Sequence, residues 1–166
     1  MNFTETAWKV FNKSIEDYHV SDDVNTLINN PFEKDTLERI LYAKNWIDTV
    51  QWHLEDIIRD ENIDPVEALQ LKRAIDASNQ KRTDLVEFID SWFLKKYESV
   101  TPKPNAKINT ETIAWAVDRL SILALKVYHM SLEANRDSAS EEHRANCQAK
   151  LDVLTAQHED LSTSIN

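Results

Sequence analysis

None of the 166 residues of this chain is glycine. Glycine is the residue that most readily takes positive φ angles and lets the backbone approach a ligand closely. Phosphate-binding loops, dinucleotide fingerprints and nucleophile elbows all need glycine at fixed positions, so the sequence excludes such sites. Tight β-hairpins also favour turns that contain glycine. We therefore expect a helical protein whose chemistry, if any, is carried by side chains on helix faces.

The composition is that of a soluble, acidic, globular chain. Its formal net charge is -10, a charge that repels nucleic acid and anionic lipid, and no basic patch offsets it. The single cysteine, Cys147, can form neither an internal disulfide nor a cysteine-rich zinc site. No stretch is long and apolar enough to span a bilayer, and the first residues show no secretory signal. We expect a cytoplasmic protein with no nucleic-acid partner and no membrane insertion.

Apolar periodicity and capping residues predict five helices in a single domain, residues 1–166. The expected helices cover about residues 4–18, 35–59, 64–98, 110–132 and 138–161. Asp35, Asp64 and Ser138 are the expected N-caps of the second, third and fifth helices, and Pro65 suits the first helical position.

The connections between these helices predict the topology. Residues 99–109 form the longest linker, residues 24–28 are expected to add one helical turn, and residues 162–166 are expected to fray. Short connections join the second helix to the third and the fourth to the fifth, which favours antiparallel neighbours. The predicted fold is an all-α, up-down bundle of about five helices.

The second helix carries a row of apolar residues at helical spacing and a polar row beside it. The expected core row is Ile40, Ala43, Ile47, Val50, Leu54 and Ile58. The neighbouring row contains Asp48, Trp52, Glu55 and Arg59, while Gln51 falls inside the core row itself. Carboxylates and a guanidinium are therefore expected among apolar neighbours, away from the solvent-facing side.

The sequence of the third helix offers a partner for the carboxylates of the second helix. Its core row, which runs from Leu71 to Phe93, includes Asn79 and Arg82, and Asp76 flanks it. A buried guanidinium cannot lose its proton, so it requires a carboxylate. The short connection predicts Ala74 opposite Gln51 and places Arg82 about one turn from the level of a carboxylate on the second helix. We predict a polar layer of Asp48, Gln51, Asn79 and Arg82, with Asp48 as the first partner of Arg82 and Glu55 as the second.

Two interpretations of this layer stay open. Buried polar networks often fix helix register without binding anything. Alternatively, the layer binds a polar or anionic small molecule, and Arg82 clamps the anion. The residues assigned to such a site are Asp48, Gln51, Trp52, Glu55, Arg59, Asp76, Asn79 and Arg82.

No metal or cofactor is predicted. A carboxylate-bridged dimetal bundle needs a Glu-x-x-His motif on each of two helices. Residues 16–19 hold the only copy, at the end of the first helix, and His53 with Asp56 points away from the predicted core row. His158 is expected to be a hydrogen-bonded boundary residue, and Cys147 a buried apolar one.

The second and third helices also resemble a known family. The residues that carry the resemblance are Asp48, Trp52-His53-Leu54-Glu55-Asp56 and Arg59, then Ile75-Asp76, Asn79-Gln80, Arg82, Glu87 and Ile89-Asp90, with Asn30-Pro31-Phe32 ahead of them. They are similar to family 4254 of the domains of unknown function, most strongly over residues 30–93. The resemblance implies a small, cytoplasmic, all-helical bacterial protein with no established activity, encoded near glycosyltransferase genes for cell-envelope polysaccharide.

The sequence therefore predicts a non-catalytic interaction or scaffold protein. Its expected partner is a second copy of the chain, which would make a homodimer, or one of those glycosyltransferases, to which it would be an accessory protein. The long third helix supports this prediction, because about 34 residues exceed what a five-helix monomer needs. Enzymatic activity is left uncertain, since no usual catalytic group is assembled. The alternative is a bundle that binds or transforms a small polar molecule. A polar layer that opens onto a cavity would favour this alternative.

Overall fold

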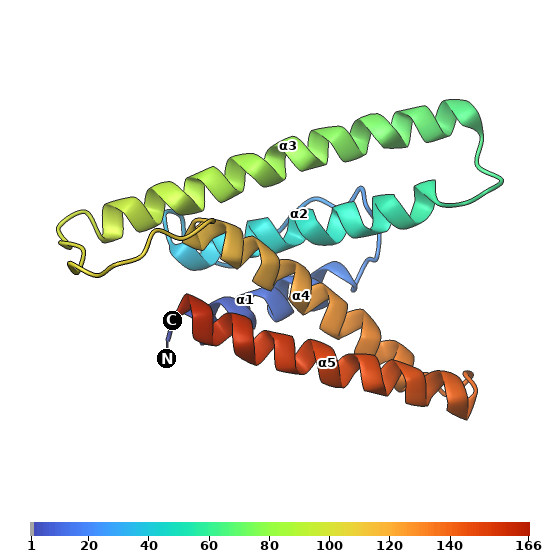
Figure 1. Cartoon of the computed structure of the whole chain (residues 1–166). Coiled ribbons are helices and arrows are strands. Elements are labelled where there is room, and N and C mark those ends of the chain that lie inside the picture. The colour runs from blue at the N-terminus through green and yellow to red at the C-terminus, as the bar shows by residue number, and fades with distance from the viewer. Residues whose placement is uncertain (1) are drawn as a thin grey trace.

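The computed structural model describes residues 2–166, and these residues form five α-helices and no strand. The helices are α1 (Phe3–Tyr18), α2 (Leu37–Ile58), α3 (Pro65–Lys96), α4 (Ile113–Ala134) and α5 (Glu141–Ile165). Figure 1 shows α3 running back along α2, α4 crossing this pair obliquely, and α5 returning along α4. The prediction of an all-α helical bundle is confirmed. Within residues 2–166, no helix is both long and apolar enough to cross a membrane.

Side-chain caps show where the helices begin. The Asp64 carboxylate accepts hydrogen bonds from the first backbone N–H groups of α3, as predicted. Helices α2 and α5 are capped by Thr36 and Ser140 instead of Asp35 and Ser138. At Asp35 the reason is its φ of 64°, because an N-cap residue needs an extended backbone.

Two further expectations about local structure were wrong. Residues 24–28 contain only a turn and no helical segment. The end of α5 does not fray after residue 161, since the helix continues to Ile165. The Asn166 side-chain amide donates a hydrogen bond to Thr4 Oγ1 at 2.7 Å, which ties the end of α5 to the start of α1. Figure 1 accordingly shows the two chain ends side by side.

The core lies where α1, α2, α4 and the C-terminal half of α3 meet. Helix α2 contacts the other three and is therefore buried nearly all round. Its predicted core row was largely misplaced, because Leu54 is buried but Ile40, Ala43, Ile47, Val50 and Ile58 are only partly buried. The other buried residues of α2 are Leu41, Tyr42, Lys44, Asn45, Trp46, Asp48 and Thr49. A single apolar face is the pattern of a helix covered on one side, and α2 is covered on three.

Helix α3 joins the hydrophobic core through its C-terminal half, whereas its N-terminal half buries Ile75 and Ser78 outside that core. Ile89 is fully buried, whereas Leu69, near the start of α3, is 51% exposed. We expect Ile89→Ala to lower the free energy of unfolding by about 2–5 kcal/mol, because it removes packed atoms and leaves a cavity. Leu69→Ala should change it by less than about 0.5 kcal/mol. Urea denaturation followed by circular dichroism measures both, and equal effects would contradict this packing.

Candidate functional site

A buried lysine lies at the centre of the polar layer. The Lys44 side chain, on α2, has no exposed surface. Its ammonium pairs with Asp48, one turn further along α2, and lies 2.8 Å from Oδ1 of Asp118 on α4. An unpaired ammonium in the interior would cost several kcal/mol. The two carboxylates are therefore what allow Lys44 to be buried.

Arg82 joins this network from α3. Its Nη2 lies 2.9 Å from Asp118 Oδ2, and its Nε lies 3.1 Å from Asp118 Oδ1 and 3.1 Å from Asp48 Oδ1. Arg82 does form an ion pair with Asp48, but the predicted hydrogen bond to a carboxylate of the second helix is absent: all three side-chain hydrogen bonds that Arg82 makes within residues 2–166 go to Asp118 on α4, and Glu55 is not a partner. The Arg82 side chain is 24% exposed, so it is less buried than predicted. Two cations and two carboxylates from three helices thus balance one another.

The environments of the two carboxyl groups push their pKa values in opposite directions. Burial raises the pKa of Asp48 above its usual range, although Lys44 and a 2.6 Å hydrogen bond from Ser121 favour the charged form. Burial also disfavours the charged form of Asp118, but Lys44 and Arg82 outweigh it, and the pKa of Asp118 is lowered. Carboxyl pairs separated in this way are typical of sites where one group holds a proton and the other a charge.

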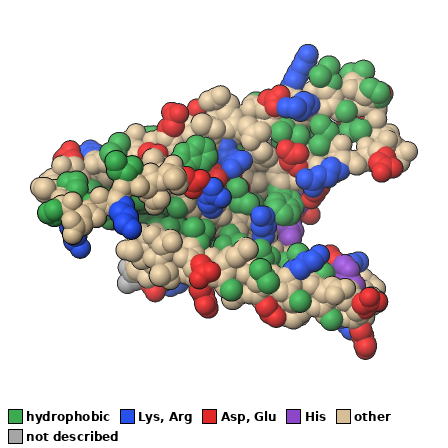
Figure 2. Space-filling model, in the orientation of Figure 1, with side chains coloured by type: hydrophobic (Ala, Val, Ile, Leu, Met, Phe, Trp, Pro, Cys, Tyr) green, Lys and Arg blue, Asp and Glu red, His purple; other side chains and the backbone are tan. Residues whose placement is uncertain are grey.

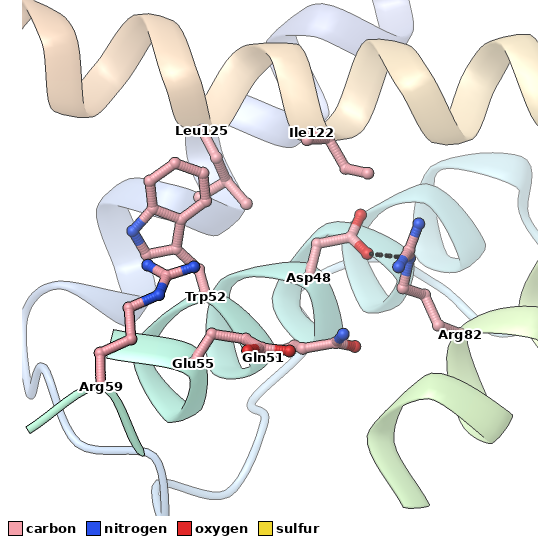
Figure 3. A pocket seen from close by; sticks show the side chains of 8 residues that line it. All are labelled: Asp48, Gln51, Trp52, Glu55, Arg59, Arg82, Ile122 and Leu125. Atoms are coloured by element: carbon pink, nitrogen blue, oxygen red, sulfur yellow. Dashed lines mark ion pairs between the residues drawn. The ribbon is translucent and has the colours of Figure 1, made fainter. Parts of the chain in front are cut away.

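The network opens on one side onto a cavity of about 180 Å³ between α2, α3 and α4 (Figure 3). The cavity is lined by Asp48, Gln51, Trp52, Glu55, Arg59, Arg82, Ile122 and Leu125. Figure 3 shows the Asp48 carboxylate turned toward Arg82 beside the aliphatic side chain of Ile122. Asp48 Oδ1 is buried and accepts no hydrogen bond of good geometry within residues 2–166. A buried acceptor in this state has capacity for a hydroxyl group or water.

The structure brings together six of the eight residues that the sequence assigned to a site. Asp48, Gln51, Trp52, Glu55, Arg59 and Arg82 all line the cavity. Asn79 is exposed at its edge, where its Oδ1 accepts a 2.8 Å hydrogen bond from Gln51. Asp76 lies outside the cavity, on the exposed surface, and pairs with Lys72. The prediction that Asn79 lies in the core of α3 was therefore wrong.

The pairing of α2 with α3 is shifted relative to the prediction. Gln51 contacts Ser78 and Asn79, about one turn further along α3 than the expected Ala74. The shift arises because residues 59–64 do not form a tight hairpin: the start of α3 projects past the end of α2 (Figure 1). It also brings Arg82 level with Asp48.

Sequence reasoning missed Lys44 and Asp118. A lysine beside an apolar row usually extends its ammonium to water, so the position of Lys44 in the sequence did not predict that its ammonium is buried. The available signal was the Lys44–Asp48 spacing of four residues, which places both groups on one helix face. A second signal was Asp118, which lies in the most apolar helix, where a charge requires a partner.

A family model described as "Protein of unknown function (DUF4254)" matches residues 38–166. The chain belongs to this family. The match covers α2 to α5, so it extends past residue 93 to residue 166, whereas residues 30–37, which include the Asn30-Pro31-Phe32 part of the resemblance, lie outside it. Among curated proteins and among solved structures, nothing matches the chain. Membership of the DUF4254 family assigns no activity, so function rests on the site itself.

The buried network predicts a ranking of three substitutions. Lys44→Met should lower the free energy of unfolding by about 3–5 kcal/mol, because two buried carboxylates lose their shared cation. Arg82→Ala should cost about 1.5–3 kcal/mol, because Arg82 is partly exposed and Lys44 remains. Lys13→Met, which removes an exposed pair with Asp17, should cost at most about 1 kcal/mol. Urea denaturation near neutral pH measures all three.

The loss of unfolding free energy caused by Lys44→Met should also depend on pH. Burial already raises the pKa of Asp48, so the folded variant binds a proton more readily than the unfolded chain does. Its deficit should therefore shrink as the pH falls from about 7 to about 4. A deficit as small as that of Lys13→Met, or one that grows in acid, would contradict the buried network.

Proposed function

We propose that the 180 Å³ cavity binds a small polyhydroxylated molecule, of which a neutral monosaccharide is the simplest example. The observation that carries this proposal is the opening of the Asp48–Arg82 pair onto a cavity (Figure 3). A network that only fixed helix register would be closed by side chains on every side. Asp48 Oδ1 instead has capacity to accept a hydrogen bond.

The lining supports this class of ligand. The carboxylates of Asp48 and Glu55 balance the guanidinium groups of Arg59 and Arg82, so the cavity has no strong preference for an ion of either sign. Carboxylates accept hydrogen bonds, guanidinium groups donate them, and the Gln51 amide does both. Hydroxyl groups, which donate and accept, suit such a mixture.

An apolar wall completes the cavity. Trp52, Ile122 and Leu125 present carbon surface along one side of it (Figure 3). The C–H face of a sugar ring is apolar and packs against such surfaces, while its hydroxyl groups turn to the polar side. A mainly apolar lining with a few placed polar groups is typical of small-molecule sites.

Binding is the role proposed here, and turnover would extend it. Asp48 lines the cavity and has a raised pKa, and a general acid needs both properties. Turnover of a sugar that binds in the cavity, abolished by Asp48→Asn or Arg82→Met without unfolding, would make the cavity an active site.

The binding proposal is tested by thermal shift and calorimetry with a panel of neutral monosaccharides and sugar phosphates. We expect at least one neutral sugar to raise the Tm, because a ligand that binds only the folded state stabilises it. Gln51→Ala should abolish the shift. Gln148→Ala, an exposed amide on α5, is the matched control and should preserve it. Binding of phosphorylated sugars alone, or no loss in Gln51→Ala, would contradict the proposal.

Association with a protein is a second candidate function, and the α2–α3 surface favours it. A groove of about 600 Å³ there is lined on its apolar part by Ile40, Ala43, Leu85, Phe88 and Trp92. Phe88 is 58% exposed at this groove, which is unusual for so large an apolar side chain.

We propose a second copy of this chain as the partner at that groove. In a two-fold dimer the same surface meets itself, so Phe88 of each copy can fill the groove of the other. An accessory role beside cell-envelope polysaccharide glycosyltransferases would use the same surface, and it is proposed on the family resemblance alone.

Light scattering at high micromolar concentration tests self-association. We expect a dimer that Phe88→Glu converts to monomer, because the substitution replaces the apolar side chain that fills the partner's groove with a shorter, charged one that must lose its hydration there. Leu94→Glu, on a side chain of the same helix that is 75% exposed and outside the groove, should leave the dimer intact. A strict monomer, or equal effects of the two substitutions, would contradict this candidate function.

A further inference from the structure

Three histidines that are far apart in the sequence converge at one place. His19 follows the end of α1, His53 lies on α2 and His129 on α4. One ring nitrogen of each lies within 4.8 Å of the other two. Figure 2 shows histidine side chains (purple) at the inner end of the notch between the α2–α3 and α4–α5 arms. None of the three lines the 180 Å³ cavity, so this histidine cluster is separate from the site proposed above.

The hydrogen bonds leave nitrogen lone pairs directed into the cluster. His19 Nδ1 lies 2.7 Å from the carbonyl oxygen of Ile15. A carbonyl only accepts, so His19 Nδ1 carries the proton and Nε2 of the neutral ring carries the lone pair. A metal-binding histidine commonly donates its other ring N–H to a backbone carbonyl in this way.

A hydrogen bond between the rings of His19 and His53 leaves the His129 ring without a hydrogen-bond partner in the cluster. His19 Nε2 and His53 Nε2 lie 3.3 Å apart, a separation at which one can donate to the other. That bond leaves His129 Nε2, which is buried and has no hydrogen-bond partner within residues 2–166. A single cation among the rings would satisfy all three nitrogens.

The separations are close to those of a zinc site. Zn–N bonds of 2.0–2.1 Å in a tetrahedron place two ligand nitrogens about 3.3 Å apart. The His19–His53 separation of 3.3 Å has this value. All three ring nitrogens lie within 4.8 Å of one another, so a shift of the rings by roughly 1 Å brings them to the spacing of a zinc site.

The surroundings hold two of the rings, those of His53 and His129, in place and favour their uncharged form. Tyr18 stacks on His53 with ring centroids 5.1 Å apart, and Trp52 stacks on His129 at 5.0 Å. Burial lowers the pKa of His53 and lowers that of His129 to about 4. Neutral imidazole is the form that coordinates a metal, so near neutral pH no proton has to be displaced from these two rings.

An acidic residue stands beside the open side of the cluster. Asp22 Oδ1 lies 3.6 Å from His53 Nε2, and its side chain is 58% exposed. Asp22 has a φ of 50°, a left-handed conformation that aspartate tolerates better than most residues. Asp22 lies in the loop that follows α1, and this backbone conformation turns its carboxylate toward the histidine cluster.

We propose that His19, His53 and His129 bind a divalent transition-metal ion, with Zn²⁺ the best match and Asp22 as the fourth ligand. Imidazole nitrogens suit Zn²⁺, Cu²⁺ and Ni²⁺, and a tetrahedral arrangement of three nitrogens and one carboxylate suits Zn²⁺. The ion would connect α1, α2 and α4.

Metal titration of the tag-free, chelator-treated chain tests the site. We expect one equivalent of Zn²⁺ by calorimetry, a raised Tm with Zn²⁺, and visible absorption of tetrahedral Co²⁺. His53→Gln should weaken Zn²⁺ binding by about 100-fold or more, and Asp22→Asn by about tenfold. His158→Gln, which changes a histidine stacked on Trp8 outside the cluster, is the matched control and should bind within about threefold of the natural chain.

Three results would overturn the proposal. The first is the absence of saturable Zn²⁺ and Co²⁺ binding. The second is Zn²⁺ binding of unchanged affinity in each of two single variants, His53→Gln and His129→Gln, once circular dichroism has shown that both variants fold. The third is a thiolate-to-Co²⁺ charge-transfer band in the natural chain. Such a band would place the ion at Cys147, whose Sγ lies 3.4 Å from His143 Nε2, and it can be observed without any variant.

Discussion

The buried ammonium of Lys44 is the constraint on which the arrangement of the helices depends. It sits on α2, the helix that contacts α1, α3 and α4, and it pairs with Asp48 and with Asp118 of α4. Arg82 of α3 binds the same two carboxylates. Sliding α3 or α4 by one turn would strand a charge in the interior at a cost of several kcal/mol. The network therefore selects one register among the packings that apolar contacts alone would allow.

The same network forms the floor of the cavity, so fold and candidate site share their residues. Lys44 and Ser121 hold the Asp48 side chain from the buried side. Its Oδ1 is left toward Arg82 and the cavity (Figure 3). Trp52 extends this connection, because it lines the cavity and stacks on His129 of the histidine cluster. The two proposed sites thus bind different ligands, but Trp52 forms part of the wall of both.

The helices and the Asp48–Arg82 pair could be predicted from the sequence, because both depend on local pattern. Apolar spacing and the Asp64 cap mark the helices, and an arginine within an apolar row demands a carboxylate. The rotation of α2 could not be predicted, since a helix surrounded by three others has no single apolar face. The histidine cluster was out of reach for a different reason: its members come from three elements, and His19 and His53 are 34 residues apart. Only the packing of α1, α2 and α4 brings them together.

The buried charge network is tested most directly by the titration of its carboxyl groups. Carbon-13 NMR of the aspartate carboxyl carbons, assigned with Asp48→Asn and Asp118→Asn, follows each group as the pH is lowered. The network predicts that Asp48 titrates above the usual aspartate range, because it is buried, and that Asp118 titrates below it, because Lys44 and Arg82 hold its charge. Titration of both groups together, at the value of an exposed aspartate, would show that these residues are hydrated and would contradict the account.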